Sequence, residues 1–235
     1  MNKNVEQYEL FKRGEVRMPS HLKPEKEEKA KLYKNKFIEL LSKAPFGVPH
    51  VMWLLLFFAF IWYSIFRTEM TGFEILISTV SGFFVWTLIE YTMHRFLYHT
   101  ETNSEGFLNF QMSMHGNHHL YPKDPDRLAM PPVPGLVLSS VFLGTFYLIM
   151  GTYAFAFFPG FMLAYDAYIT IHYYQHRVKS PKYKPWKKLW QHHKAHHYSN
   201  PYSAFGVSTR FWDFVFGTMP KAANQRKKVN VKAVA

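Results

Sequence analysis

The chain has 235 residues, a formal net charge of +12 and no cysteine, which excludes a disulfide framework, a thiolate-bound iron–sulfur cluster and thiol catalysis. Hydrophobic residues make up 48% of the chain, and they are concentrated in long stretches from which the charged residues are segregated. This segregation indicates a membrane protein and argues against one or two soluble domains. It also favours anionic lipid over nucleic acid as the partner of the basic residues.

The first 47 residues are predicted to form a cytosolic N-terminal segment. Residues 1–21 show no ordered pattern, whereas residues 24–43 are rich in Lys and Glu and become more apolar toward their end. This composition is typical of an amphipathic helix that lies at the membrane interface, and a solvated helix without lipid contact is the alternative. A cleavable signal peptide is not expected, because the first long apolar stretch begins only at residue 48.

Three apolar stretches follow. Residues 48–66 and 73–93 each match the roughly 20 residues that a helix needs to cross a bilayer. Residues 133–171 run almost without charge for about twice that length. We place a turn within residues 151–160, a region that contains Pro159. The sequence therefore predicts four transmembrane helices arranged as two hairpins.

The basic residues predict the orientation of these helices. Lys and Arg number 11 in residues 1–47, 3 in residues 94–130 and 13 in residues 177–235, and the remaining one is Arg67. An even number of crossings places all three basic segments in the same compartment, and the positive-inside rule makes it the cytoplasm. Both termini are therefore expected to be cytoplasmic.

Eleven of the 13 histidines lie between residues 94 and 197, in four groups. Imidazole is the commonest metal-ligating side chain, and one zinc ion needs only about four ligands. So many imidazoles without any thiolate therefore predict a pair of metal ions. The four groups are His94 with His99; His115, His118 and His119; His172 with His176; and His192, His193, His196 and His197.

The position of these groups predicts a cap on the helices. They follow the second and fourth apolar helices or lie at the ends of those helices, so they are expected to meet at the cytoplasmic face. His94 and His99 are five residues apart, about 140° around an ideal helix. They converge only if the helix ends or bends between them, or if each binds a different metal. The predicted fold is all-α: an integral membrane four-helix bundle capped by a cytosolic, histidine-rich dimetal site.

Several polar residues near the histidines are candidates for supporting roles. Glu90 lies one helical turn before His94, and we expect it to be an outer-shell partner of the ligands. Asp213 is a candidate for the same role or for a helix cap. His192 is the extra member of its group, so it is predicted to be a spare or an outer-shell residue.

The histidine segments carry a resemblance to a known family. The chain resembles the membrane fatty acid hydroxylase superfamily over residues 86–218, and most closely its fatty acid (sphingolipid) 2-hydroxylase branch. The motifs are EYTMHRFLYH at residues 90–99, HGNHH at 115–119, HYYQH at 172–176, and HKAHH at 193–197. More specific to the branch are Pro122, Asp124, Arg127 and the MPP of residues 130–132, which follow the HGNHH motif.

The resemblance implies a membrane hydroxylase domain over residues 48–220. The remaining residues, 221–235, are predicted from their composition to form a basic tail. It implies O2-dependent insertion of a hydroxyl group into a fatty acyl C–H bond at a histidine-bound dimetal centre. Iron is expected in the active enzyme, and zinc is able to occupy the same site in a purified sample. The ten ligands implied are His94, His99, His115, His118, His119, His172, His176, His193, His196 and His197.

The substrate and the redox partner are predicted less directly. Lys123 and Arg127 could hold the headgroup of the lipid, or serve as ordinary positive charge on the cytoplasmic side. The first 47 residues do not contain the cytochrome b5 domain that is typical of eukaryotic 2-hydroxylases, so we expect a separate electron donor resembling cytochrome b5 or a ferredoxin. We expect a bacterial inner membrane more than the endoplasmic reticulum.

Other functions remain open from the sequence alone. A sterol or lipid desaturase, a sterol methyl oxidase and a carotenoid hydroxylase of the same superfamily share the ligand spacing. A membrane metal-binding or transport protein is a further alternative, although a transporter should carry ligands near the middle of the bilayer. A zinc protease is not favoured, because no His-Glu-x-x-His motif is present.

Overall fold

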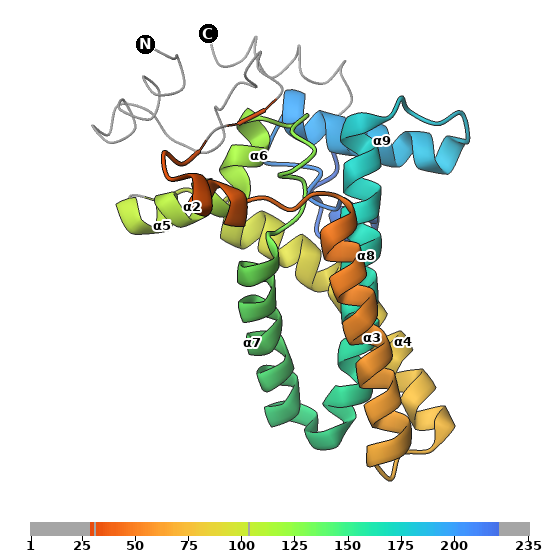
Figure 1. Ribbon diagram of the computed structural model, residues 1–235. Helices are drawn as coiled ribbons and strands as arrows, with labels where there is room; N and C mark the ends of the chain where they lie inside the picture. The colour runs from red at the N-terminus through yellow and green to blue at the C-terminus, as the bar shows by residue number, and fades with distance from the viewer. Residues whose placement is uncertain (1–28, 31, 103, 221–235) are drawn as a thin grey trace, which may run out of the picture.

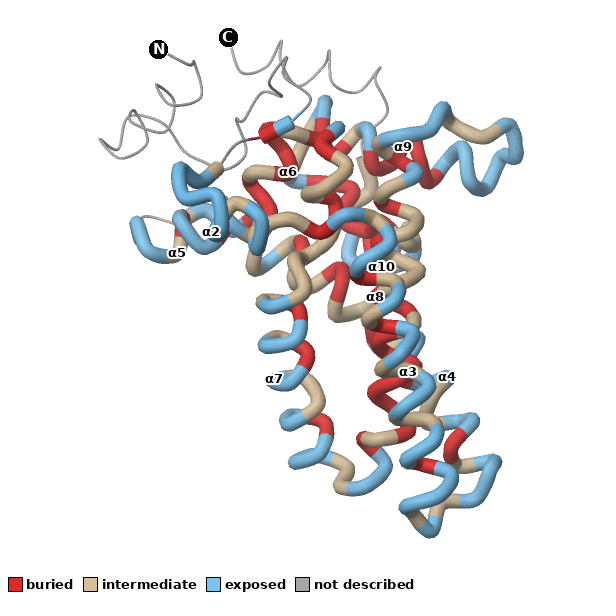
Figure 2. The backbone as a smooth tube through the Cα atoms, in the orientation of Figure 1, coloured by how far each residue is buried: buried red, intermediate tan, exposed pale blue. Residues whose placement is uncertain are grey.

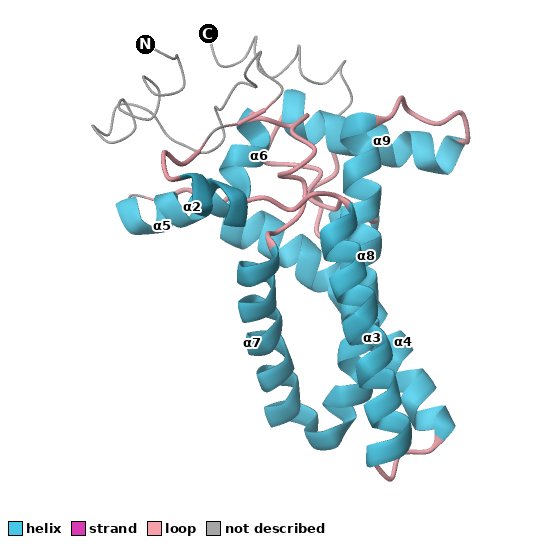
Figure 3. Ribbon diagram, viewed as in Figure 1, coloured by secondary structure: helices cyan, strands magenta, loops and turns pink. Residues whose placement is uncertain are grey.

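The computed structural model describes residues 29–30, 32–102 and 104–220, and every regular element within these ranges is a helix (Figure 3). The prediction of an all-α protein is therefore confirmed for the described residues. The predictions for residues 1–21 and for the tail at 221–235 lie outside them.

The first two long helices form a hairpin. α3 spans Gly47–Arg67 and α4 spans Gly72–Thr92, close to the predicted apolar stretches. Thr71 caps α4: its hydroxyl accepts a hydrogen bond from the backbone N–H of Glu74, and the Glu74 carboxylate accepts one from the N–H of Thr71. This capping box explains how α4 tolerates a carboxylate in its first turn.

The third apolar stretch folds back on itself. α7 (Pro132–Met150) and α8 (Ala154–Arg177) are joined by a short 3-10 turn, η3 (Gly151–Tyr153), and run antiparallel (Figure 1). Gly151 has a φ of 59°, a conformation in which a side chain would be strained. The predicted turn at residues 151–160 was too long, because Pro159 lies inside α8, where it removes only one backbone hydrogen bond.

The long helices have the character of membrane spans. Gly47–Arg67, Gly72–Tyr98 and the 46 residues of Pro132–Arg177 are long and apolar enough to cross a membrane, the last including α7, η3 and α8. Many residues along these helices are exposed (Figure 2). They include large apolar residues, such as Leu148 on α7, which is 88% exposed. Such faces are stable against lipid and unfavourable in water.

α8 is the central helix, and its closest neighbour is α4. Gly82 of α4 lies so near α8 that a Cβ atom there would come within 2.0 Å of the Phe157 carbonyl oxygen. At Gly160 of α8, a Cβ atom would come within 1.7 Å of the carbonyl oxygen of Thr79. The Thr79 hydroxyl donates a 2.8 Å hydrogen bond to the carbonyl of Ala156 across the same contact. Small residues thus let the two backbones approach closely, as is common between membrane helices.

Aromatic side chains fill the space beside this contact. Trp86 of α4 packs edge-on against Phe161 and Tyr165 of α8, with ring centroids 5.1 and 5.0 Å apart. Trp53 of α3 contacts Tyr165 in the same manner at 5.5 Å. These offset and edge-on contacts hold α3, α4 and α8 together.

Short elements gather at the end of the bundle opposite η3 (Figure 1). The loops between them cross over the ends of the long helices (Figure 3). They are α2 (Lys36–Leu41), η1 (Met93–Tyr98), α5 (Glu105–Gln111), η2 (Met112–Gly116), α6 (Asn117–Leu120), α9 (Lys184–Tyr198) and α10 (Phe211–Val215).

The N-terminal helix is shorter than predicted. Within the described part of residues 24–43 only α2 is helical. The preceding amides bind side chains instead: Ala30 N–H donates to Asp124 at 2.9 Å, and Tyr33 N–H donates to Glu39 at 3.0 Å. These bonds compete with helix formation. The segment is tied to the loop that contains Asp124, while Phe37 and Leu40 of α2 are 67% and 66% exposed.

The close contact between α4 and α8 can be tested with one pair of substitutions. Gly160→Val should disrupt the packing because its side chain would collide with the backbone at Thr79, and it should lower the apparent unfolding temperature in detergent by roughly 5 °C or more. Gly144→Val on α7 is the control, since no atom lies within 4 Å of its Cβ position. Equal behaviour of the two variants in a thermal-unfolding assay would contradict the contact.

Candidate metal centre

The first pair of histidines is brought together by a π-helical turn. α4 continues into η1, which is a π-helix over Met93–Tyr98. The i→i+5 hydrogen bonding of a π-helix brings residues five apart nearly onto one face, unlike the α-helix. The rings of His94 and His99 are consequently 5.0 Å apart, centroid to centroid. The structure thus places both histidines in one group, and of the possibilities left open by the spacing it shows a helix that becomes π-helical and ends at Tyr98, before His99.

Two sets of three histidines, at 115, 118 and 119 and at 193, 196 and 197, are each divided between two clusters. In each set, the two histidines four residues apart on a helix point to one cluster, and the histidine between them points to the other. One ring nitrogen from each of ten histidines is thereby placed in two groups of five, and within each group these nitrogens lie within 4.8 Å of one another. Group 1 is His94, His99, His115, His119 and His196; group 2 is His118, His172, His176, His193 and His197.

The spacing of the nitrogens fits metal coordination. Two nitrogens bound at right angles to one ion, each at about 2.1 Å, lie about 3.0 Å apart. Several pairs of Nε2 atoms approach one another to this distance. Examples are 3.0 Å for His94 and His115, 3.1 Å for His99 and His196, 2.9 Å for His118 and His172, and 2.7 Å for His176 and His193.

Backbone carbonyls set the tautomers of three imidazoles. A carbonyl oxygen only accepts hydrogen bonds, so the Nδ1 atom that faces it carries the hydrogen and the Nε2 atom presents its lone pair to the group. This is the usual outer-shell arrangement of a metal-ligating histidine. The pairs are His94 with Phe205, His196 with Ser203 at 2.9 Å, and His172 with Leu128 at 2.9 Å.

Burial keeps the imidazoles neutral. Removal from water lowers the pKa of His196 to about 4, against the ordinary 6.5. Burial, followed by the mutual repulsion of neighbouring imidazolium charges, also lowers the pKa of His99, His115, His118, His119, His193 and His197 well below the ordinary value. Neutral imidazoles are the form that binds a metal ion.

Glu90 lies close to this site but contacts it differently from the prediction. Its carboxylate accepts hydrogen bonds from the N–H of Val207 at 2.7 Å, from the N–H of Ser208 at 3.0 Å, and from the Ser208 hydroxyl. We expected a direct bond to a ligating imidazole such as His94. The carbonyl of Phe205 takes that place, because the loop that Glu90 binds passes directly over η1.

His192 belongs to neither group. Its Nε2 atom lies 2.8 Å from a carboxylate oxygen of Asp213, and both side chains are almost completely buried. Burial alone would raise the pKa of Asp213, but hydrogen bonds from His192, Thr218 and the Gly206 amide hold it below its ordinary value. Its partners are in the loop before α10 and on α9, so Asp213 does more than cap a helix.

The two predicted headgroup residues have different surroundings. Arg127 forms an ion pair of 2.6 Å with Glu39 and donates to the carbonyl of Ser42, so its charge is already balanced. Its side chain nevertheless lines the cavity described below. Lys123 is exposed. A headgroup-binding role for either residue stays a prediction.

A cavity of about 110 Å³ connects the bundle interior with the histidines. Its walls come from all four long helices, and most of them are apolar or aromatic, including Trp53, Phe142 and Phe161. At its other end lie His94 and His115 of group 1 and His118 and His172 of group 2. An apolar chain in this cavity would therefore end beside both groups.

Sequence reasoning missed the parts of the site that are backbone. The residue types of Phe205, Ser203 and Leu128 do not show that their carbonyls bind histidines, because every residue has a backbone carbonyl. Gln175 was also missed: its amide donates to the carbonyl of Val207 at 3.2 Å. Its position between His172 and His176 on α8 was the signal that could have found it.

The long apolar helices, with two clusters of buried imidazoles at one end, place this chain among membrane proteins that carry a candidate dimetal site. The family model described as fatty acid hydroxylase matches residues 79–218, more than half of the chain. The chain therefore belongs to the fatty acid hydroxylase family, as its motifs predicted.

The relatives support the 2-hydroxylase branch. The chain is 36% identical over 205 residues to the ceramide very long chain fatty acid hydroxylase scs7 of Schizosaccharomyces pombe, which covers 84% of this chain and 57% of that protein. It is 39% identical over 149 residues to the fatty acid 2-hydroxylase of Homo sapiens, covering 59% of this chain and 38% of the other. The match thus spans about half of the yeast protein and less of the human one.

A solved structure has the same fold. The chain is similar to full-length scs7p, of which only the hydroxylase domain is visible, with a TM-score of 0.74 and 34% sequence identity. The similarity covers 83% of this chain and 75% of that chain. The arrangement of helices is therefore shared with a fatty acid hydroxylase domain.

The buried imidazoles predict a sensitivity to acid. Because the folded pKa of His196 is about 4 and its unfolded value is near 6.5, the unfolded chain binds more protons between these values. Stability should therefore be greatest above pH 6.5 and fall as the pH is lowered through this window, by roughly 3 kcal/mol for this one residue. The unfolding temperature of the metal-stripped protein, measured from pH 7.5 to 4.5, checks this. A constant value would contradict neutral burial of the imidazoles.

A second prediction separates His192 from its neighbour. His193→Ala removes a nitrogen that lies 2.7 Å from that of His176, so bound metal should decrease strongly. His192→Ala should be far milder, since its ring contacts Asp213 and no member of either group at hydrogen-bond distance. Metal content by mass spectrometry of the two purified variants distinguishes them. Equal losses would mean that His192 is a ligand.

Proposed function

We propose that this protein catalyses the O2-dependent hydroxylation of a lipid acyl chain, at carbon 2. The reaction inserts one oxygen atom of O2 into a C–H bond and reduces the other to water, using two electrons from a donor and two protons. The observation that carries the proposal is the apolar cavity that ends at both histidine groups. The names of the relatives agree with this chemistry.

The two groups of five imidazoles would each hold one metal ion, with the ten histidines as ligands. The neutral imidazoles and the lack of any cysteine suit iron(II), and zinc is able to bind the same donors. When bound and reduced, a pair of irons supplies the activation of O2 that an inert C–H bond requires. The remaining tasks fall to the protein's own side chains.

The cavity would orient the substrate. The acyl tail would lie between α7 and α8, against Phe142 and Phe161, where apolar walls exclude water. The polar head would lie at the histidine end, near Arg127 and Lys123. The carbon that reaches the metal groups is then one close to the head, which supports hydroxylation at carbon 2 over a position deep in the chain.

The membrane arrangement is part of the same proposal. α3, α4, α7 and α8 would cross the bilayer as two hairpins, with the histidine groups and both termini in the cytoplasm. The segregation of basic residues outside these helices supports this orientation. A separate redox protein, resembling cytochrome b5 or a ferredoxin, would supply the electrons. The relatives named above come from a yeast and from human, which weakens the expectation of a bacterial membrane and favours the endoplasmic reticulum.

Two other functions are separated from this one by simple observations. A desaturase would use the same site but remove two hydrogens from the chain, so the mass of the product decides. A metal transporter would need ligands along its path through the membrane. Among the described residues the ten clustered histidines lie at one end of the helices, which disfavours transport.

The proposed function is tested by the loss of one group 2 imidazole. His118→Ala should abolish 2-hydroxy fatty acids and lower bound metal, because its Nε2 atom lies within 3.0 Å of those of His172 and His197. Acyl chains are measured by mass spectrometry after total hydrolysis of lipids from cells that express the wild type or the variant. Full hydroxylation by the variant would refute the ligand role, and desaturated products from the wild type would move the protein to the desaturases.

A further inference from the structure

The two histidine groups are supported by different parts of the chain. In group 1, His94 and His196 donate to the carbonyls of Phe205 and Ser203, which belong to one loop, residues 203–208. We call this segment the carbonyl loop. In group 2, His172 donates to the carbonyl of Leu128, in the loop before α7. No member of group 2 is hydrogen-bonded to the carbonyl loop among the contacts of the described residues.

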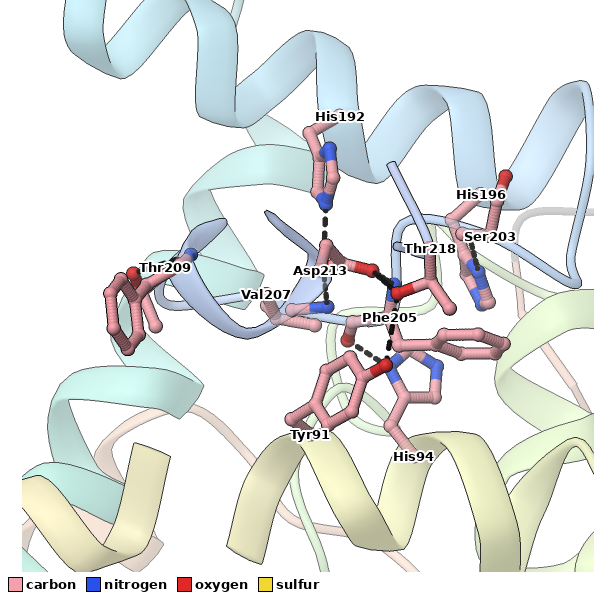
Figure 4. Close-up of polar contacts among 12 residues, drawn as sticks. Tyr91, His94, His192, His196, Ser203, Phe205, Val207, Thr209, Asp213 and Thr218 are labelled. Atoms are coloured by element: carbon pink, nitrogen blue, oxygen red, sulfur yellow. Dashed lines mark hydrogen bonds and ion pairs between the residues drawn. The ribbon is translucent and has the colours of Figure 1, made fainter. Parts of the chain in front are cut away.

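Two buried carboxylates bind the carbonyl loop. Asp213 accepts the N–H of Phe205 at 2.9 Å and the N–H of Gly206 at 2.7 Å (Figure 4). Glu90 accepts the N–H groups of Val207 and Ser208. Asp213 is 0% and Glu90 is 5% exposed. Four consecutive backbone amides of the loop are therefore hydrogen-bonded to buried carboxylates, and water does not compete for these bonds.

Asp213 is itself fixed in place. His192 on α9 lies 2.8 Å from one of its oxygens, and the hydroxyl of Thr218 donates to the other at 2.7 Å (Figure 4). The Thr218 hydroxyl is also 2.9 Å from the phenol oxygen of Tyr91 on α4. This network reaches from α9 to α4 and does not include a member of group 2.

The carbonyl loop needs such restraint, because its backbone is strained. Ala204 has a φ of 61° and is the one non-glycine residue with positive φ in the described part of the chain. A Cβ atom at Gly206 would come within 1.9 Å of the carbonyl oxygen of Thr209. Without the carboxylates the loop would relax, and its carbonyls would leave the Nδ1 atoms of His94 and His196.

We propose that Asp213 and Glu90 are positioning residues for one metal position only: through the carbonyl loop they orient the imidazoles of group 1, and they leave group 2 unaffected. The inference rests on the metal-binding part of the proposed function. It assigns to the His192–Asp213 pair the task of holding a backbone loop, which explains why a histidine next to three ligands is not a ligand. It also predicts that loss of either carboxylate weakens metal binding at group 1 and not at group 2.

The test is the number of metal ions that Asp213→Asn retains. An amide has one acceptor oxygen where the carboxylate has two, so donors among His192, Thr218, Phe205 and Gly206 lose their partner. Loss of an outer-shell contact typically weakens a metal site by about 10- to 100-fold. After dialysis against a chelator, the purified variant should therefore retain one metal ion per chain where the wild type retains two, measured by mass spectrometry of the metals.

Double variants identify the position that is lost. Asp213→Asn combined with His99→Ala, both acting on group 1, should still retain one metal ion. Asp213→Asn combined with His118→Ala should retain close to none, because the second substitution removes a member of group 2. A merely structural effect of Asp213 would lower metal at both positions and would make the two double variants alike.

The matched control is Asp166→Asn. Asp166 on α8 also pairs with a histidine, His50 of α3, at 2.6 Å, and it is 15% exposed. Its hydrogen bonds within the described part of the chain are to His50 and Thr170 and none is to the carbonyl loop, so the variant should keep both metal ions. Thr218→Val is a milder change, because it removes one hydrogen bond to Asp213, and it should accelerate the release of one metal ion. This variant replaces Asp213→Asn in the test if Asp213→Asn does not fold.

Three results would overturn the inference. They are retention of both ions by Asp213→Asn and Thr218→Val, equal loss from both positions, and an equal loss in Asp166→Asn. The result is independent of product formation: a wild type that binds two ions but makes no hydroxy acid would refute the proposed reaction and leave this inference standing. A wild type that binds fewer than two ions would overturn both.

Discussion

The close contact between α4 and α8 is the constraint on which the rest of the structure depends. Gly82 and Gly160 let the two backbones touch, and the hydroxyl of Thr79 adds a hydrogen bond between them. α4 leads into the π-helix with His94 and His99, and α8 ends with His172 and His176. Because both helices are rigid and in contact, histidines almost eighty residues apart in the sequence are held beside one another at one end of the bundle.

Bringing ten imidazoles together has a cost that the fold must compensate. Burial keeps them neutral, and the close approach of their nitrogens is favourable only when a cation lies among them. The protein orients several of the rings with backbone carbonyls, which accept a hydrogen bond without adding charge. The carboxylates Asp213 and Glu90 act one step further out, where they bind the loop that presents two of these carbonyls.

The cavity extends from the interior of the long helices to the histidines. Between the long helices its walls are largely aromatic, and at the other end it reaches histidines of both groups. This arrangement suits a substrate with a long apolar tail and a polar head, since each part meets an environment that solvates it. Membership of the fatty acid hydroxylase family agrees with such a substrate.

The sequence by itself determined the helical class of the fold and the ten histidines that the structure brings together. Uninterrupted apolar stretches of about 20 residues indicate membrane-spanning helices, and histidines four residues apart on a helix lie on one face. Tertiary structure decided what depends on contacts between distant residues. The division of each set of three histidines between groups 1 and 2 depends on how α6, α8 and α9 are placed relative to one another. The hydrogen bond from His94 to the carbonyl of Phe205 involves the backbone, so the type of the residue does not predict it. Local pattern also did not predict the π-helical turn at η1, which changes the direction of His99. Sequence periodicity reports the geometry of one helix, whereas the site is built from several.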